Sequence, residues 1–93
     1  MIKSFADKKT RRFCEDGVAE GFLKDVEKTA RRKVVMLEIA ENLNDLMTFP
    51  GNKLEKLKGN REGQYSIRIN DRYRICFRFQ DGAAYDVEIT DYH

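Results

Sequence analysis

The chain has 93 residues, of which 41% are hydrophobic and 37% charged, and its formal net charge is +2. This length supports one hydrophobic core, so we expect a single soluble domain over residues 1–93. No apolar run approaches the roughly 20 residues that cross a bilayer, and charges at Lys3 and from Asp7 onward leave no apolar core for a signal peptide.

The cysteines and the single histidine indicate whether the protein could bind a structural metal. Cys14 and Cys76 are far apart, and with a single histidine the chain offers no recognisable set of four zinc ligands. We therefore expect a cytoplasmic protein that works without a metal or any other cofactor.

The first half of the chain predicts helices after a short strand. Met1 to Phe5 is typical of an opening strand, and Asp7 is a suitable N-cap for a helix that continues to about Asp16 and stops at Gly17. A second helix is expected from about Leu23 to Asn42, because apolar residues recur there at intervals of three and four. Its Arg31, Arg32 and Lys33 should then mostly face water, and residues 43–49 add one further turn before Pro50-Gly51.

After Gly59 the hydrophobic period changes from helix to strand. Apolar and polar residues alternate over 65–70, 72–79 and 85–90, which predicts three half-buried strands. Asn70-Asp71 and Asp81-Gly82 are turn signals, so an antiparallel meander with helices on its apolar face is expected. The predicted class is α+β.

The parity of the apolar positions predicts the register. Residues that lie opposite each other in an antiparallel pair share a face. All the apolar residues can therefore be buried together only if the numbers of each opposed pair sum to an even value. Three-residue loops at 70–72 and 81–83 meet this condition. The first loop then places Arg68 opposite Arg74. The second places Arg74 opposite Thr90 and Arg78 opposite Asp86. Tyr92 comes roughly opposite Arg72, with His93 after it. Two opposed arginines repel each other, which makes sense where an anion such as a phosphate sits between them.

Basic residues concentrate in one part of the chain. Residues 53–78 hold eight Lys or Arg against three Asp or Glu, a net charge of +5. Such a segment is a common footprint of phosphate binding, although a solvated surface is the plain alternative.

The residues available suit metal-independent cleavage of RNA. That reaction needs a proton removed from the ribose 2′-hydroxyl, charge stabilised on the phosphorane, and a proton for the leaving 5′-oxygen. His93 is the only side chain whose unperturbed pKa lies near neutrality. Lys58, Arg68 and Arg74 are cations, and Tyr92 can stack on a base. A frayed terminal histidine and ordinary surface charges are the structural alternatives, and we interpret both cysteines as structural.

The sequence also resembles a known family over essentially its whole length. Residues 53–59 (KLEKLKG), residues 63–75 (GQYSIRINDRYRI) and the closing Asp91-Tyr92-His93 resemble the HigB toxins, or plasmid maintenance killer proteins, of the RelE/ParE superfamily. The Leu-Glu form at residues 54–55 is closer to the GraT-like members than to HigB toxins with a histidine at the position of Glu55.

This resemblance implies a compact RelE-like fold and a type II toxin that inhibits translation by ribosome-dependent cleavage of mRNA. It implies a HigA-like helix-turn-helix antitoxin as partner, with DNA contacted only through that antitoxin. It places catalytic roles on Lys58, Arg74, Tyr92 and His93, and substrate contacts on Arg68, Arg61 and Glu55; the general base stays open because Glu55 replaces the histidine. The alternative is a module that binds RNA or the ribosome without cleaving, or that acts with its antitoxin as a co-regulator.

Overall fold

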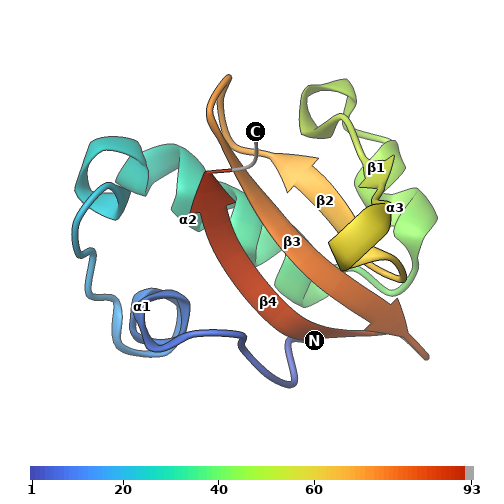
Figure 1. Ribbon diagram of the computed structural model, residues 1–93, viewed down its shortest axis with the longest axis horizontal. Helices are drawn as coiled ribbons and strands as arrows, with labels where there is room; N and C mark the ends of the chain where they lie inside the picture. The colour runs from blue at the N-terminus through green and yellow to red at the C-terminus, as the bar shows by residue number, and fades with distance from the viewer. Residues whose placement is uncertain (92–93) are drawn as a thin grey trace.

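The computed structural model describes residues 1–91, which form a sheet with helices packed on one face. The sheet is antiparallel with strand order β1-β2-β3-β4. In Figure 1, α2 lies behind the sheet and α1 lies beside β4. This is the expected α+β architecture. The elements are α1 (Lys8–Arg11), α2 (Leu23–Ile39), α3 (Leu43–Met47), β1 (Glu55–Lys56), β2 (Tyr65–Arg68), β3 (Tyr73–Gln80) and β4 (Ala83–Asp91).

The hydrophobic core fills the space between the helices and the sheet. Apolar residues that alternate along β2, β3 and β4 meet the apolar stripe of α2 there, as the two periodicities predict. The fully buried residues of the core include Phe13, Leu23, Leu37, Ile67, Ile75, Phe77 and Val87.

The N-terminal segment runs along β4 where a strand was expected, but it is not a continuous strand. It forms two isolated parallel bridges, Ile2 with Ala84 and Phe5 with Val87. Between them, Asp86 has φ +53° and its N–H donates to the Ser4 hydroxyl at 2.9 Å instead of continuing a regular ladder. The irregularity in β4 therefore breaks the pairing into two parts.

The first helix begins and ends where the sequence predicts. The Asp7 carboxylate accepts from the Thr10 N–H at 2.7 Å, which caps α1. The winding changes to a π-helix over Arg12–Asp16 and stops at Gly17, whose φ of +74° suits a residue without Cβ.

The second helix is shorter than predicted. It ends at Ile39 rather than Asn42, because Ala40 is extended and Asn42 caps the next helix. Asn42 and Asp45 form a reciprocal capping box, in which each side chain accepts from the other residue's N–H. Helix α3 replaces the single turn expected over residues 43–49.

Lys33 is buried, so the prediction that it faces water is wrong. It lies three residues after Ala30 and four before Leu37, on the stripe that α2 packs against the core. Only 6% of Lys33 is exposed, and its ammonium donates to the Asn52 side-chain oxygen at 2.5 Å. The Asn52 amide in turn donates to the Leu46 carbonyl at 3.0 Å, which joins α2 to the turn after α3.

The first hairpin has the predicted register, whereas the second has it only from Tyr73 to Cys76 and departs from it between the bulge and the turn. Arg68 faces Arg74 across β2 and β3, and Arg74 faces Thr90 across β3 and β4. Asp81 and Gly82 form a two-residue turn, both with positive φ, as type I′ turns require. A bulge opposite Cys76 to Arg78 restores the parity, so that Arg78 faces Tyr85 rather than Asp86.

This bulge changes which β4 residues are buried. Val87 reaches the core as predicted, whereas Tyr85 is 36% exposed and Ala84 is buried instead. Strand β1 was not predicted, because two exposed residues carry no alternating pattern.

We predict that Lys33→Met destabilises the fold by about 1–3 kcal/mol at neutral pH, because the buried Asn52 oxygen loses its donor. Burial, with Arg32 and Arg68 nearby, lowers the Lys33 pKa in the folded state from its ordinary 10.5. The unfolded chain then holds the Lys33 proton more tightly, so the parent gains stability as pH rises toward that value.

Urea unfolding of parent and Lys33→Met at a series of alkaline pH values measures this effect. The difference between their free energies of unfolding should grow with pH. A difference that stays constant would mean that Lys33 titrates alike in both states.

Candidate functional site

The candidate site lies on the sheet face that points away from the helices. Arg68 and Arg74 lie directly across from each other there, yet their side chains turn apart. Arg68 pairs with Asp71 in the hairpin loop, and Arg74 leans toward β1. Repulsion between the two guanidinium groups is thereby relieved within the protein itself.

Arg74 is held by two short hydrogen bonds and by a longer one, from a terminal nitrogen to the Ser66 carbonyl at 3.4 Å. Its Nε donates to the hydroxyl of the fully buried Ser66 at 2.7 Å, and one terminal nitrogen donates to the Lys53 carbonyl at 2.6 Å. Only 12% of the Arg74 side chain is exposed, and Glu55 lies 3.9 Å from the guanidinium. Arg74 and Glu55 therefore lie within reach of one small ligand, with the guanidinium fixed in orientation.

Lys58 lies on an irregular segment that starts at Lys53, whose carbonyl accepts a hydrogen bond from Arg74. Lys53 has φ +42°, which turns the chain into β1. Leu57 is buried and its N–H donates to the Gln64 carbonyl at 2.9 Å, which fixes the backbone just before Lys58. Lys58 itself is exposed and precedes the short 3₁₀ turn Gly59–Arg61.

Arg61 holds this segment against the sheet. Its guanidinium donates to Gln64 and to the Glu88 carboxylate on β4, both at 3.1 Å. The Arg61 and Glu88 side chains are each about three-quarters covered. Their contacts suit anchoring of residues 59–64 more than contact with a ligand.

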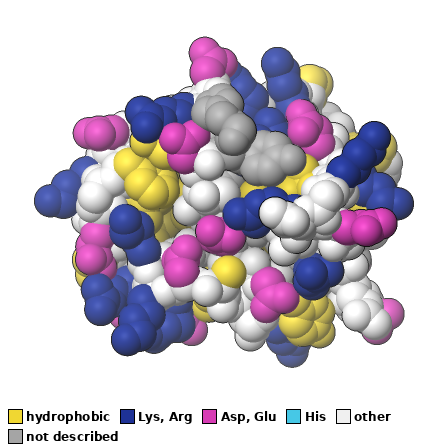
Figure 2. Space-filling model, in the orientation of Figure 1, with side chains coloured by type: hydrophobic (Ala, Val, Ile, Leu, Met, Phe, Trp, Pro, Cys, Tyr) yellow, Lys and Arg dark blue, Asp and Glu magenta, His cyan; other side chains and the backbone are white. Residues whose placement is uncertain are grey.

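The basic segment is less cationic in space than in sequence. Ion pairs join each of its five arginines to a carboxylate, and Figure 2 shows basic and acidic side chains interspersed over this face. Within residues 1–91 its three lysines, Lys53, Lys56 and Lys58, form no ion pair, so they carry the excess charge. The five pairs are Arg61–Glu88, Arg68–Asp71, Arg72–Asp91, Arg74–Glu55 and Arg78–Asp86.

The structure thus brings some of the predicted site residues together and separates others. Glu55 and Arg74 are neighbours, and Lys58 follows on the same short segment. Arg68 is next to Arg74 in register but turns away, and Arg61 contacts Glu88 instead. Tyr92 and His93 lie outside the described residues.

Ser66 is the contributor that the sequence did not reveal. Its only signal is its position on the same strand face as Arg68, diagonal to Arg74, where a small hydroxyl leaves room for a guanidinium to cross. No group of three or more His, Cys, Asp or Glu suited to a metal ion occurs within residues 1–91. No helix in that range is long and apolar enough to span a bilayer.

Comparison with known proteins gives a family for this chain. A model described as "RelE-like toxin of type II toxin-antitoxin system HigB" matches residues 3–93. Toxin HigB-1 of Vibrio cholerae is 38% identical over 85 residues, covering 90% of each chain. Endoribonuclease HigB of Proteus vulgaris is 37% identical over 94 residues, covering 100% of both.

Solved structures share the fold. A YoeB-YefM toxin-antitoxin heterotetramer from Staphylococcus aureus matches with a TM-score of 0.62 and 22% identity, over 100% of this chain and 98% of the other. The YoeB dimer of that organism matches with a TM-score of 0.57 and 23% identity, over 99% and 94%. At such identities the likeness establishes the fold, here that of RelE-like toxins.

We predict that neither cysteine acts as a nucleophile. Burial raises the pKa of Cys14 to about 12 and also raises that of Cys76. Thiolates react and thiols do not, so iodoacetamide should alkylate the folded protein at least about a hundredfold more slowly than the unfolded chain at neutral pH. Mass spectrometry in buffer and in urea measures both rates, and equal rates would contradict the prediction.

Proposed function

This chain belongs to the HigB family of RelE-like toxins of type II toxin-antitoxin systems, and we propose that it is a metal-independent endoribonuclease that cleaves mRNA on the ribosome. The observation that carries the proposal is that the guanidinium of Arg74 is fixed beside Glu55. Glu55 lies on the segment that leads to Lys58. Full-length identity of 37% to an endoribonuclease supports it.

The proposed reaction assigns one task to each group. The ribose 2′-oxygen attacks the adjacent phosphorus and the bond to the 5′-oxygen breaks, leaving a cyclic phosphate and a 5′-hydroxyl. Arg74 and Lys58 stabilise the charge that develops on the phosphorane oxygens. A guanidinium already held by acceptors on Ser66 and Lys53 needs little reorganisation for this task.

The two proton transfers complete the balance. The Glu55 carboxylate, 3.9 Å from Arg74, accepts the proton of the 2′-hydroxyl. His93, as imidazolium, gives a proton to the leaving 5′-oxygen, and Tyr92 stacks on a base. Both residues follow Asp91 in the sequence. Asp91 lies across from Tyr73, the neighbour of Arg74 on β3.

The remaining proposed contacts are with the RNA backbone and the partner. Arg68 contacts a flanking phosphate after releasing the fully accessible Asp71, and Arg61 keeps the Lys58 segment in place. The site would act in the cytoplasm, where translating ribosomes are found. An antitoxin of the HigA type with a helix-turn-helix would hold the toxin inactive and carry any contact with DNA.

We predict that Lys58→Ala lowers mRNA cleavage by about a hundredfold or more, the usual effect of removing one preorganised charge-stabilising donor. Lys56→Ala is the matched control, because it removes the same charge from an exposed lysine two residues away. Mapping of mRNA ends with purified translating ribosomes measures both variants.

The control separates chemistry from general attraction to RNA. Equal losses in Lys56→Ala and Lys58→Ala would indicate a diffuse electrostatic surface and not a catalytic lysine. Ribosome binding without new mRNA ends, in the parent and in a His93→Ala variant alike, would favour the module that binds without cleaving.

We also predict that Ser66→Ala lowers the cleavage rate by about tenfold, because the Arg74 Nε loses the acceptor that orients it. Ser66 acts through Arg74, so the substitution should have no further effect in an Arg74→Lys background. A double-mutant cycle on cleavage rates tests this coupling.

Thr10→Val is the control for loss of a buried hydroxyl. Thr10 is 1% exposed and accepts from the Ile89 N–H at 3.0 Å, a contact between α1 and β4 that includes none of the Arg74 hydrogen bonds. It should lower the melting temperature while leaving cleavage by the folded protein unchanged. Additive effects of Ser66→Ala and Arg74→Lys would show that Ser66 only supports the fold.

A further inference from the structure

A buried polar network connects helix α2 to the turn that precedes the candidate site. The Lys33 ammonium donates to the Asn52 side-chain oxygen, and the Asn52 amide donates to the Leu46 carbonyl of α3. Asn52 is fully buried, and its backbone N–H donates to the Phe49 carbonyl at 2.9 Å. Three hydrogen bonds, which involve α2, α3 and the chain three residues earlier, therefore fix Asn52.

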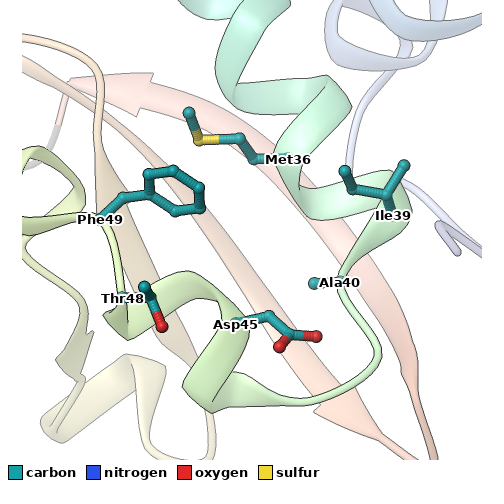
Figure 3. Close-up of a pocket in the computed structure, with 6 residues that line it drawn as sticks. All are labelled: Met36, Ile39, Ala40, Asp45, Thr48 and Phe49. Atoms are coloured by element: carbon teal, nitrogen blue, oxygen red, sulfur yellow. The ribbon is translucent and has the colours of Figure 1, made fainter.

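Apolar packing alone does not hold this turn. A hollow of about 280 Å³ lies between α2 and α3, and Figure 3 shows Met36 and Phe49 pointing toward each other across it. Phe49 directly precedes the turn Pro50–Asn52 and is 49% exposed. Side chains that line a hollow lack the close contacts of a packed core. The hydrogen bond from Lys33 therefore supplies a tie between α2 and the turn that packing does not.

A buried charge at position 33 is unfavourable for stability. Among the described residues Lys33 forms no ion pair, its partner Asn52 is neutral, and the nearby Arg32 and Arg68 repel its charge. An apolar pair at positions 33 and 52 would serve the fold about as well, because both the ion and its acceptor would then be absent from the core. The lysine is better explained by what its hydrogen bond fixes.

Lys53 follows Asn52 and has a strained backbone. Its φ of +42° and ψ of 57° are left-handed values that residues other than glycine rarely adopt. Such a conformation persists only where the surrounding structure fixes it, and it is common at functional sites. The Lys53 N–H donates to the Pro50 carbonyl at 3.2 Å, and the Lys53 carbonyl accepts from Arg74 at 2.6 Å. This left-handed turn aims the Lys53 carbonyl at the guanidinium.

We propose that Lys33 and Asn52 are positioning residues for Arg74, which act through the Lys53 carbonyl without touching the RNA. The inference rests on the proposed function in that Arg74 stabilises the phosphorane. Asn52 fixes the turn, and the turn fixes the Lys53 carbonyl. With that carbonyl displaced, the terminal nitrogen of Arg74 keeps only its longer contact with the Ser66 carbonyl, at 3.4 Å. The guanidinium could then rotate out of alignment with the phosphate.

Lys33→Met tests the proposal, because it removes the donor to Asn52 and keeps a side chain of similar length in the core. Single-turnover cleavage of mRNA on translating ribosomes should slow about tenfold under conditions where the variant is fully folded, as expected when one charge-stabilising group is misaligned. Affinity for ribosomes should not change, because no exposed charge is removed. In an Arg74→Lys background the substitution should cause no further loss.

A spectroscopic readout follows the guanidinium without cleavage. Rotation about the Cζ–Nη bonds of Arg74, measured from NMR line shapes, is slowed by the hydrogen bond to Lys53 and should become faster in Lys33→Met. If the parent fails to cleave mRNA but its guanidinium loosens in the variant, the proposed function is overturned and the positioning network stands. If the parent cleaves and the variant keeps both the parent rate and the slow rotation, the positioning network is overturned.

Asp45→Ala is the matched control for loss of stability in the same region. It breaks the capping box at the start of α3 but leaves both hydrogen bonds of the Asn52 side chain. The melting temperature should fall, while the cleavage rate and the guanidinium rotation stay at the parent values. An equal loss of cleavage in Asp45→Ala and Lys33→Met would assign the effect to stability and overturn the proposal.

The double variant Lys33→Met/Asn52→Leu decides the matter if Lys33→Met fails to fold. Replacing both partners of a buried hydrogen bond by apolar side chains costs much less stability than removing one of them. The double variant should therefore fold, yet cleave about tenfold more slowly than the parent, because no hydrogen bond from α2 fixes the Lys53 carbonyl. Recovery of the parent rate together with stability would show that Lys33 and Asn52 only support the fold.

Discussion

The candidate site depends on the hydrogen bonds that hold Arg74, of which the two shortest go to the Ser66 hydroxyl and the Lys53 carbonyl. Ser66 and the Lys53 carbonyl fix the guanidinium at two points, one in the sheet and one in the segment that leads to Lys58. Hydrogen bonds from a charged donor are typically worth about 1.5–3 kcal/mol each. The same contacts explain why Arg74 turns away from Arg68. Two directly opposed arginines repel each other, and this arrangement separates their guanidinium groups.

Pairing of charges decides what the basic segment can do. Its five arginines each have a carboxylate partner, and most of these pairs are exposed enough that each contributes little to stability. Their effect is instead to lower the local positive potential, so that the three lysines carry most of the net positive charge that this segment offers to an RNA chain. A concentration of positive charge in the sequence therefore overstates the positive charge available on the surface.

Much of the fold could be predicted from periodicity, because the strands and α2 each bury one face. The pairing of Arg68 with Arg74 followed from the same rule applied to a three-residue loop. The second hairpin could not be predicted, because Asp81-Gly82 fits both a longer loop and a two-residue turn compensated by a bulge. Ser66 and the buried Lys33–Asn52 contact depend on partners distant in sequence, which no local pattern specifies.

The buried Lys33–Asn52 contact connects the helical layer to the candidate site. Asn52 is fixed from α2, and the next residue, Lys53, supplies the carbonyl that holds Arg74. Loss of the Lys33–Asn52 contact would therefore also loosen the Lys53 carbonyl, and with it the orientation of the Arg74 guanidinium.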